Sequence, residues 1–197
     1  MKKTIAILLA LTLAFALSAC SQNAEQTSLP AEEEIPVSSD VATGNFDLPD
    51  VRFFDASLLD GSAVPSEELY AGYDVTVINC WATWCPPCLD EMDELAAYAK
   101  TLPENVQLIT YCIDGVTHTE ECQNILDQAG YEGVTLIDAT GDFATLLNQM
   151  QYVPTTLFVD SMGKLVCDSL IGSPQDLPSA YKERINIGLK AAGKSEL

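Results

Sequence analysis

The segment Trp84-Cys85-Pro86-Pro87-Cys88 constrains this chain most, because it directly follows the apolar stretch Val75–Cys80. A short apolar run predicts a buried strand, and prolines in this position are typical of the first turn of a helix. At a helix N-terminus, unpaired N–H groups and the helix dipole favour a thiolate, which lowers the pKa of Cys85 below the free value of about 8.5. The spacing predicts that Cys85 attacks a foreign disulfide and that Cys88 displaces the product.

The N-terminus has the pattern of an export signal. Lys2 and Lys3 precede the apolar run Ile5–Leu17, and Leu17-Ser18-Ala19-Cys20 follows with small residues before a cysteine. This ending resembles a bacterial lipobox, which predicts a signal peptide over residues 1–19 and a lipid on Cys20. The alternative is an ordinary cleaved secretory signal with an incidental cysteine. Both interpretations place the mature chain outside the cytoplasm, in the first case anchored to the membrane of a bacterial cell envelope.

The rest of the chain divides into a tether and one domain. Residues 20–45 are polar and include the run Glu32-Glu33-Glu34, so they bury too little apolar surface to fold and are predicted to be a disordered tether. Residues 46–197, about 150 residues, suffice for a single domain. Without Lys2 and Lys3, seven basic residues face 29 acidic ones, a net charge of −22. Such a surface excludes nucleic acid as a partner, and we expect a monomer.

Apolar periodicity predicts alternating strands and helices in this domain. Expected strands are 75–80, 106–113 and 134–137, followed by a hairpin of 155–160 with 165–170. Expected helices begin at Pro86, at a capping box of Thr117 with Glu120, near Phe143 and near Pro178. Gly130 is expected to end the second of these helices. This order predicts an α/β fold in which helices flank a mixed sheet.

Two motifs together resemble the thioredoxin superfamily. They are Trp84–Cys88 after a central strand and Val153-Pro154-Thr155-Thr156 before the hairpin. The longer stretch Ile78–Cys88, followed by Glu91, resembles the membrane-anchored TlpA/ResA-type branch. The resemblance covers Phe46 to the C-terminus and implies a thioredoxin-like fold with the extra strand and helix of that branch. It also implies that Pro154 is cis beside the disulfide, and that Trp84, Val153 and Pro154 contact the substrate chain.

Glu91 is the predicted proton acceptor of the site. It follows Cys88 by three residues and therefore shares its side of the helix. Many thioredoxins carry a buried acid at the position of Asn79, and the TlpA/ResA branch resembles this chain in carrying it at Glu91 instead. A partly buried carboxyl there would have a raised pKa and could accept the Cys88 proton. The alternative is that Glu91 only stabilises the first turns of an acidic helix.

The remaining cysteines have simpler interpretations. Cys122 lies on an apolar helix face, so a small buried hydrophobe is favoured there, and Cys112 and Cys167 are interpreted in the same way. Cys80 occupies a position that is usually aromatic in the family. Sequence fixes no pairing among these four cysteines. A zinc site is disfavoured because no second C-x₂-C is present, and the single histidine, His118, is expected in a solvated loop.

These observations predict a lipid-anchored, extracytoplasmic thiol–disulfide oxidoreductase that works without a cofactor or metal. The resemblance implies a reductase of protein disulfides, with electrons from an integral-membrane thiol carrier. Apocytochrome c and a methionine sulfoxide reductase are candidate substrates, which places the protein near cytochrome c maturation. One alternative is a peroxiredoxin-like thiol peroxidase, which would need a Thr-x-x-Cys site. Another is a non-catalytic metal-delivery lipoprotein that uses Cys85 and Cys88 as ligands.

The lipobox resemblance gives the first testable prediction. The mature protein should partition into membranes, and Cys20→Ala should release or mis-process it because the acceptor of the lipid is lost. Mass spectrometry of the N-terminal peptide measures the modification. An unmodified N-terminus at another residue would contradict the prediction.

Overall fold

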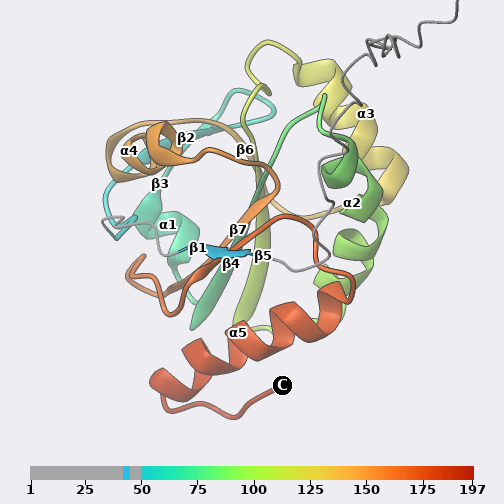
Figure 1. The fold of residues 1–197 in the computed structure, drawn as a ribbon. Helices are drawn as coiled ribbons and strands as arrows, with labels where there is room; N and C mark the ends of the chain where they lie inside the picture. The colour runs from blue at the N-terminus through green and yellow to red at the C-terminus, as the bar shows by residue number, and fades with distance from the viewer. Residues whose placement is uncertain (1–41, 45–49) are drawn as a thin grey trace, which may run out of the picture. The chain divides into compact units, whose positions relative to one another are not determined.

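The computed structural model describes residues 42–44 and 50–197, and the predictions for the signal peptide, for Cys20 and for most of the tether lie outside them. The strands are β1 (Ala42–Gly44), β2 (Asp55–Leu58), β3 (Ala63–Pro65), β4 (Val75–Trp81), β5 (Val106–Cys112), β6 (Thr135–Ala139), β7 (Thr155–Asp160) and β8 (Ser169–Ile171) (Figure 1). The helices are α1 (Ser66–Tyr70), α2 (Pro86–Ala99), α3 (Thr119–Ala129), α4 (Gly141–Gln149) and α5 (Leu177–Ala191).

The eight strands of the described residues form one mixed sheet in the order β1-β8-β7-β4-β5-β6-β2-β3. The pairs β4–β5 and β5–β6 are parallel, whereas β7 is antiparallel to β4 and to β8. Parallel strands end at the same edge of a sheet, so the loops after β4 and β5 emerge side by side. That edge is where the candidate site lies.

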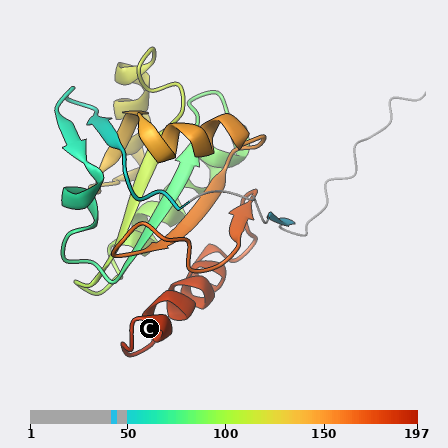
Figure 2. The ribbon, with the colours of Figure 1, turned by 90° about the vertical axis from the view of Figure 1, so that its left-hand side faces the viewer.

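Alternation along β4 divides the core into two layers, since successive strand residues face opposite sides of a sheet. Val75 and Val77 pack into a cluster with side chains of α2, α3 and α5, while Ile78 and Cys80 pack into a second cluster with α1 and α4. Figure 1 shows α2 and α3 on one side of the sheet and α1 and α4 on the other. Figure 2 looks onto the face that α4 covers. By this alternation Asn79 faces the layer of α2 and α5.

The predicted helices occur, with one correction at a helix start. Gly130 ends α3 in a left-handed conformation, as expected. The capping box predicted for Thr117 and Glu120 is wrong, because the N-cap residue of α3 is His118 and it makes no side-chain cap hydrogen bond. The Thr117 hydroxyl donates instead to the Asp114 carbonyl oxygen, at 3.0 Å, and so stabilises the preceding turn.

The hairpin differs from the prediction in its second half. Its turn forms as expected around Asp160, whose N–H donates to the carbonyl oxygen of Lys164. The strand predicted over residues 165–170 is reduced to a single bridge at Leu165 and to β8. Val166 still donates its backbone N–H to the Phe158 carbonyl oxygen at 2.9 Å, and its side chain lies near Gly188 of α5. Regular pairing resumes only at β8.

Ordered structure before β4 was not anticipated. The elements β2, β3 and α1 extend the sheet at the β6 edge and close the layer that contains α4. At the other edge β1 pairs with β8, so backbone pairing begins at Ala42, before the predicted boundary at Phe46. No helix within the described ranges is long and apolar enough to cross a membrane.

Candidate functional site

The two cysteines of the motif lie at the connection between β4 and α2, where the helix begins. Cys85 is the N-cap residue of α2, with Pro86 and Pro87 in the first turn, as predicted. It forms a disulfide with Cys88, and its sulfur accepts a hydrogen bond from the Cys88 backbone N–H at 3.3 Å. Cys85 is 3% exposed and Cys88 is fully buried, so only the first sulfur is open to a partner.

The loop before β7 completes the rim around Cys85. The Val153–Pro154 peptide bond is cis, as the family resemblance implied. The Val153 carbonyl oxygen lies 3.6 Å from the Cys85 sulfur, although 68 residues separate the two in the chain. Trp84 stands beside them with 64% of its surface exposed. Of the predicted substrate-binding residues, Val153 lies against the Cys85 sulfur, Pro154 follows it through the cis bond, and Trp84 directly precedes Cys85 in the chain.

Glu91 is more fully buried than the partly buried carboxyl predicted from the sequence. It lies on the face of α2 that also buries Cys88 and is only 5% exposed. Burial raises the pKa of the Glu91 carboxyl to about 7, although the Asn79 amide and Ser173 favour the ionised form and offset part of the effect. At neutral pH the carboxyl is therefore divided between its two protonation states, which is the condition for efficient proton transfer.

Asn79 connects Glu91 to two other elements. Its side-chain nitrogen donates to Glu91 Oε1 at 3.0 Å, and it also lies 3.1 Å from Thr156 Oγ1 and 3.2 Å from the Tyr181 hydroxyl. Thr156 and Tyr181 are themselves 2.9 Å apart. All four side chains are buried, so strand β4, helix α2, strand β7 and helix α5 meet in one polar cluster beneath the disulfide.

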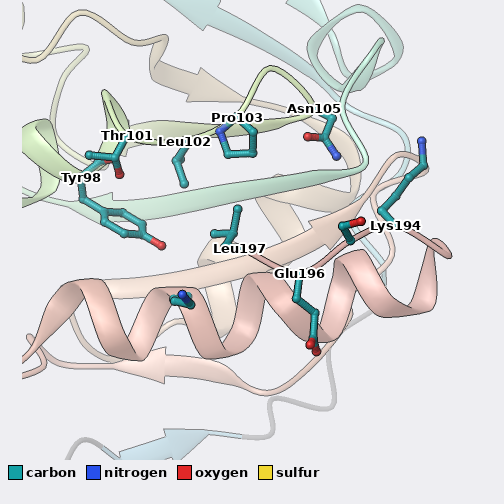
Figure 3. Close-up of a pocket in the computed structure, with 10 residues that line it drawn as sticks. Tyr98, Thr101, Leu102, Pro103, Asn105, Lys194, Glu196 and Leu197 are labelled. Carbon is teal, nitrogen blue, oxygen red and sulfur yellow. The ribbon is translucent and has the colours of Figure 1, made fainter.

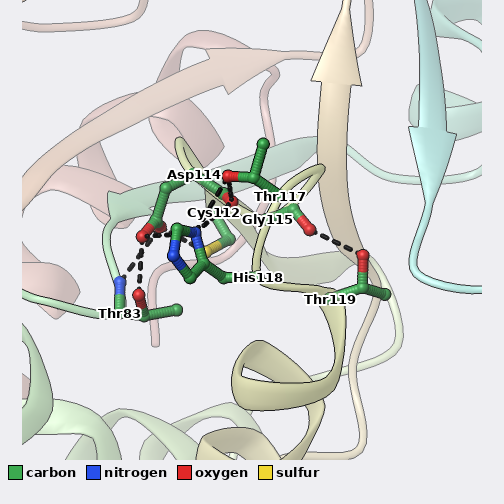
Figure 4. Close-up of polar contacts among 7 residues, drawn as sticks. All are labelled: Thr83, Cys112, Asp114, Gly115, Thr117, His118 and Thr119. Carbon is green, nitrogen blue, oxygen red and sulfur yellow. Dashed lines mark hydrogen bonds and ion pairs between the residues drawn. The ribbon is translucent and has the colours of Figure 1, made fainter.

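Asp114 ties the loop after β5 to the loop that carries the cysteines (Figure 4). Its carboxylate accepts from the backbone N–H of Thr83 at 3.1 Å and from the Thr83 hydroxyl at 2.6 Å. Partial burial of Asp114 opposes ionisation, but the hydrogen bonds from Thr83 outweigh it and hold the pKa of this carboxyl below its usual range. The Cys112 thiol also donates to it, and His118 lies 3.5 Å away on the exposed side.

The other cysteines lie in the core or at its margin. Cys80, Cys112 and Cys122 are fully buried, and Cys167 is partly buried. Burial raises the pKa of the Cys80 thiol well above its usual range. Cys80 points into the layer of α1 and α4, on the opposite face of the sheet from the disulfide. The full burial of Cys112 and Cys122 agrees with their predicted role as small buried hydrophobes, whereas Cys167 is only partly buried.

A cavity of about 640 Å³ lies elsewhere in the domain (Figure 3). It is formed between the end of α2 and the C-terminal segment, and its lining includes Tyr98, Leu102, Lys194 and Leu197. Neither Cys85 nor Cys88 lines it. The chemistry of the disulfide therefore does not depend on this cavity.

Sequence reasoning missed four polar residues of the site. Thr156 was noted only as part of a motif, and Tyr181, Thr83 and Asp114 were not singled out as site residues. A signal existed for Asp114, which follows the end of the strand next to the central one, where site residues gather in α/β sheets. No local signal marks Tyr181, which lies 102 residues from Asn79.

Comparison with known protein families assigns this chain to one of them. Residues 45–167 match the AhpC/TSA family, which is more than half of the chain. The chain belongs to the AhpC/TSA family. No curated protein matches it.

Solved structures show the fold of this AhpC/TSA member to be thioredoxin-like. A thiol:disulfide interchange protein of Chlorobium tepidum is 18% identical, with a TM-score of 0.58 over 74% of this chain and 99% of that chain. A secreted Mycobacterium tuberculosis disulfide oxidoreductase, homologous to E. coli DsbE, is 20% identical with a TM-score of 0.52 over 66% and 92%. StoA from Bacillus subtilis is 17% identical, with a TM-score of 0.53 over 68% and 98%. The predicted fold class is confirmed.

The Thr83–Asp114 contact gives the second testable prediction. Asp114→Ala leaves the nearly buried N–H and hydroxyl of Thr83 without their acceptor, so the free energy of unfolding should fall by about 2 kcal/mol in urea denaturation. Asp93→Ala, which removes an exposed carboxylate from α2, is the matched control and should change it by less than about 0.5 kcal/mol.

The pH dependence of this difference checks its cause. The pKa of Asp114 is lower in the folded chain than in the unfolded one, so its contribution is full above an unfolded value of about 3.9. It is lost as the pH falls through the folded value. A difference between wild type and Asp114→Ala that stays constant down to pH 2 would contradict this account.

Proposed function

We propose that this protein is a thiol–disulfide oxidoreductase that reduces disulfides of protein substrates. The observation that carries the proposal is the placement of Cys85 as the N-cap residue of α2, disulfide-bonded to a buried Cys88 and facing the Val153 carbonyl oxygen. A helix N-terminus stabilises the thiolate that attacks, and a first cysteine that keeps slight exposure before a fully buried second one separates attack from resolution.

The proposed reaction has two exchange steps. In the reduced protein the Cys85 thiolate attacks one sulfur of the substrate disulfide, and the other substrate sulfur leaves as a thiolate that takes up a proton. Cys88 then loses its proton and attacks the Cys85 sulfur, which releases the second substrate thiolate. The substrate gains two electrons and two protons, and the protein ends with the Cys85–Cys88 disulfide. A dithiol donor returns it to the reduced state.

Glu91 is the proposed base of the second step. Cys88 is buried away from water, so the proton that it releases needs an acceptor within the protein. With a pKa of about 7, a large fraction of Glu91 is ionised at neutral pH and can take that proton. The buried position of Glu91 favours this role over the alternative of a surface acid that only stabilises the helix.

The finer assignment follows from the resemblance to the TlpA/ResA branch. The helix α3 and the strand β6, which precede α4 and Pro154, are consistent with the extra elements of that branch. We propose on this basis a lipid-anchored, extracytoplasmic reductase, supplied with electrons by an integral-membrane thiol carrier. Apocytochrome c or a methionine sulfoxide reductase would be its substrate. The similar protein of Mycobacterium tuberculosis is itself described as secreted.

Two other functions make different demands on the same residues. A thiol peroxidase with a Thr-x-x-Cys site would need threonine three positions before Cys85, where this chain has Ala82. A metal-delivery protein would need the sulfurs of Cys85 and Cys88 as reduced thiolates that both bind the metal ion. Peroxide consumption by the reduced protein would favour the first alternative, and a bound metal ion that blocks insulin reduction would favour the second.

The third testable prediction concerns the two cysteines. Cys85→Ser should abolish the reduction of insulin by dithiothreitol, because the attacking thiolate is lost. Cys88→Ser should instead accumulate mixed disulfides with the substrate, visible on non-reducing gels. The buried Cys122→Ser variant is a control that keeps both sulfurs of the site. Full insulin reduction by Cys85→Ser would remove the central claim.

The direction of electron flow is tested separately. We expect the reduction potential of the Cys85–Cys88 pair, titrated against glutathione or dithiothreitol, to be strongly reducing. A potential above that of the glutathione couple would make the protein an oxidase.

The fourth testable prediction concerns Glu91. Glu91→Gln should slow resolution by Cys88 about 10²-fold, the typical effect of losing a general base, with less effect on the first attack by Cys85. It should also remove an inflection near pH 7 from the profile of the resolution rate, since the group that titrates there is gone. Stopped-flow measurement of both steps checks this. An unchanged rate and profile would assign Glu91 a purely structural role.

A further inference from the structure

The two oxygens of the Glu91 carboxyl are in different surroundings. Oε1 accepts a hydrogen bond from the Asn79 side-chain nitrogen at 3.0 Å. Oε2 is fully buried and has no hydrogen-bond partner among the residues that the structure describes. A buried oxygen without a donor is a poor place for negative charge and a favourable place for a proton. Asn79 therefore supplies the hydrogen bond to Oε1, while Ser173 also favours the ionised form of the carboxyl.

The Asn79 amide is itself held in one orientation. It has two N–H donors, and one of them serves Glu91. The other is shared between Thr156 Oγ1 at 3.1 Å and the Tyr181 hydroxyl at 3.2 Å. The Asn79 carbonyl oxygen makes no hydrogen bond within the described residues, so the amide is bound entirely through its nitrogen.

Aromatic packing fixes Tyr181. Its ring meets Phe158 of β7 edge-on at 5.6 Å between centroids and Tyr98 of α2 edge-on at 5.9 Å. Burial raises the pKa of the Tyr181 hydroxyl, so it stays neutral and serves as a hydrogen-bonding group. The packing of α5 against α2 and β7 therefore determines where the Tyr181 hydroxyl lies relative to Asn79.

The described groups around the Glu91 carboxyl include no positive charge among those that hydrogen-bond to it, and Asn79 is a neutral donor. Glu94 on α2 disfavours ionisation of Glu91, the Tyr181 hydroxyl faces it from α5, and Ser173 faces it from the segment before α5. The side chains that hydrogen-bond in this cluster, Asn79, Thr156 and Tyr181, carry no positive charge. Asn79 therefore supplies a hydrogen bond without a counter-charge.

We propose that Asn79 is a positioning residue that binds Glu91 Oε1 and thereby assigns Oε2 as the atom that takes the proton of Cys88, with Tyr181 and Thr156 orienting the amide. The inference rests on the proposed function. In the step concerned, the S–H bond of Cys88 breaks and an O–H bond forms at Glu91 Oε2. The electron pair stays on the Cys88 sulfur, which then attacks Cys85.

The test is the titration of Glu91 in the oxidised protein, followed by NMR of ¹³C-labelled glutamate carboxyls. Asn79→Leu removes the donor to the ionised form, so the pKa of Glu91 should rise by about one pH unit. The ionised fraction at pH 7 would then fall, and resolution by Cys88 should slow roughly fivefold at that pH. The inflection in the pH profile of resolution should move upward with the NMR titration.

Tyrosine variants separate orientation of the amide from packing. Tyr181→Phe removes the hydroxyl that holds Asn79 and should raise the Glu91 pKa by less than Asn79→Leu does. Tyr98→Phe is the matched control, because it deletes a buried hydroxyl that has no partner in the described region and should leave the titration unchanged. Equal shifts in the two tyrosine variants would overturn the role of Tyr181.

Asn79→Asp keeps the shape of the side chain and serves if Asn79→Leu does not fold. It would place two carboxyls about 3 Å apart, so Glu91 should titrate in two coupled steps, the upper one well above 7. A Glu91 titration that neither Asn79 variant alters would overturn the proposal. Failure of the proposed function is a separate outcome, because a wild-type protein that does not reduce insulin leaves the NMR titration unaffected.

Discussion

The buried pairing of β4 with β5 and β7 is the constraint on which the rest of the structure depends. All seven residues of β4 are buried, and its register with both neighbours runs almost its full length. The parallel neighbour brings the loop of Asp114 beside the loop of Thr83 and Cys85. The antiparallel neighbour brings Val153 and Pro154 to the same edge from the opposite direction. A one-residue shift in this register would exchange the two faces of β4. Asn79 would then point away from Glu91, and Cys80 would point toward it.

The parts of the fold that could be predicted are those with strong local signals. The strand β4 is a mostly apolar run, α2 starts with two prolines, and α3 ends at Gly130. Each of these elements can therefore be predicted from its own sequence, without knowledge of the elements that pack against it. The elements β2, β3 and α1 are three to five residues long and acquire their apolar contacts from the core layer that they share with α4 and the central strands. The second strand of the hairpin is likewise shorter than predicted, with a bridge at Leu165 and the three residues of β8. Short elements take their structure from tertiary packing rather than from their own sequence.

The candidate site divides in a similar way. Cys85, Cys88 and Glu91 lie within seven residues, where helical spacing fixes their relation, and Val153 and Pro154 were available only through the family resemblance. Asn79 was noted as standing where many thioredoxins carry a buried acid, but its partners Thr156 and Tyr181 lie 77 and 102 residues away in the chain. The Thr117–Glu120 pattern fitted a helix cap and was wrong, because α3 begins one residue later, with His118 as its N-cap residue, and the Thr117 hydroxyl donates to the Asp114 carbonyl oxygen in the preceding turn. Local patterns rank possible hydrogen bonds, and the tertiary fold selects among them.

The near-complete burial of the two sulfurs also affects how copies of the protein meet one another. For electrons to pass between two identical molecules, Cys85 of one would have to reach the disulfide of the other, and each of these sulfurs is recessed behind its own rim. A net charge far below zero adds mutual repulsion at every approach. We therefore expect electron exchange between identical molecules to be slow, so that reduced and oxidised copies can coexist without equilibrating.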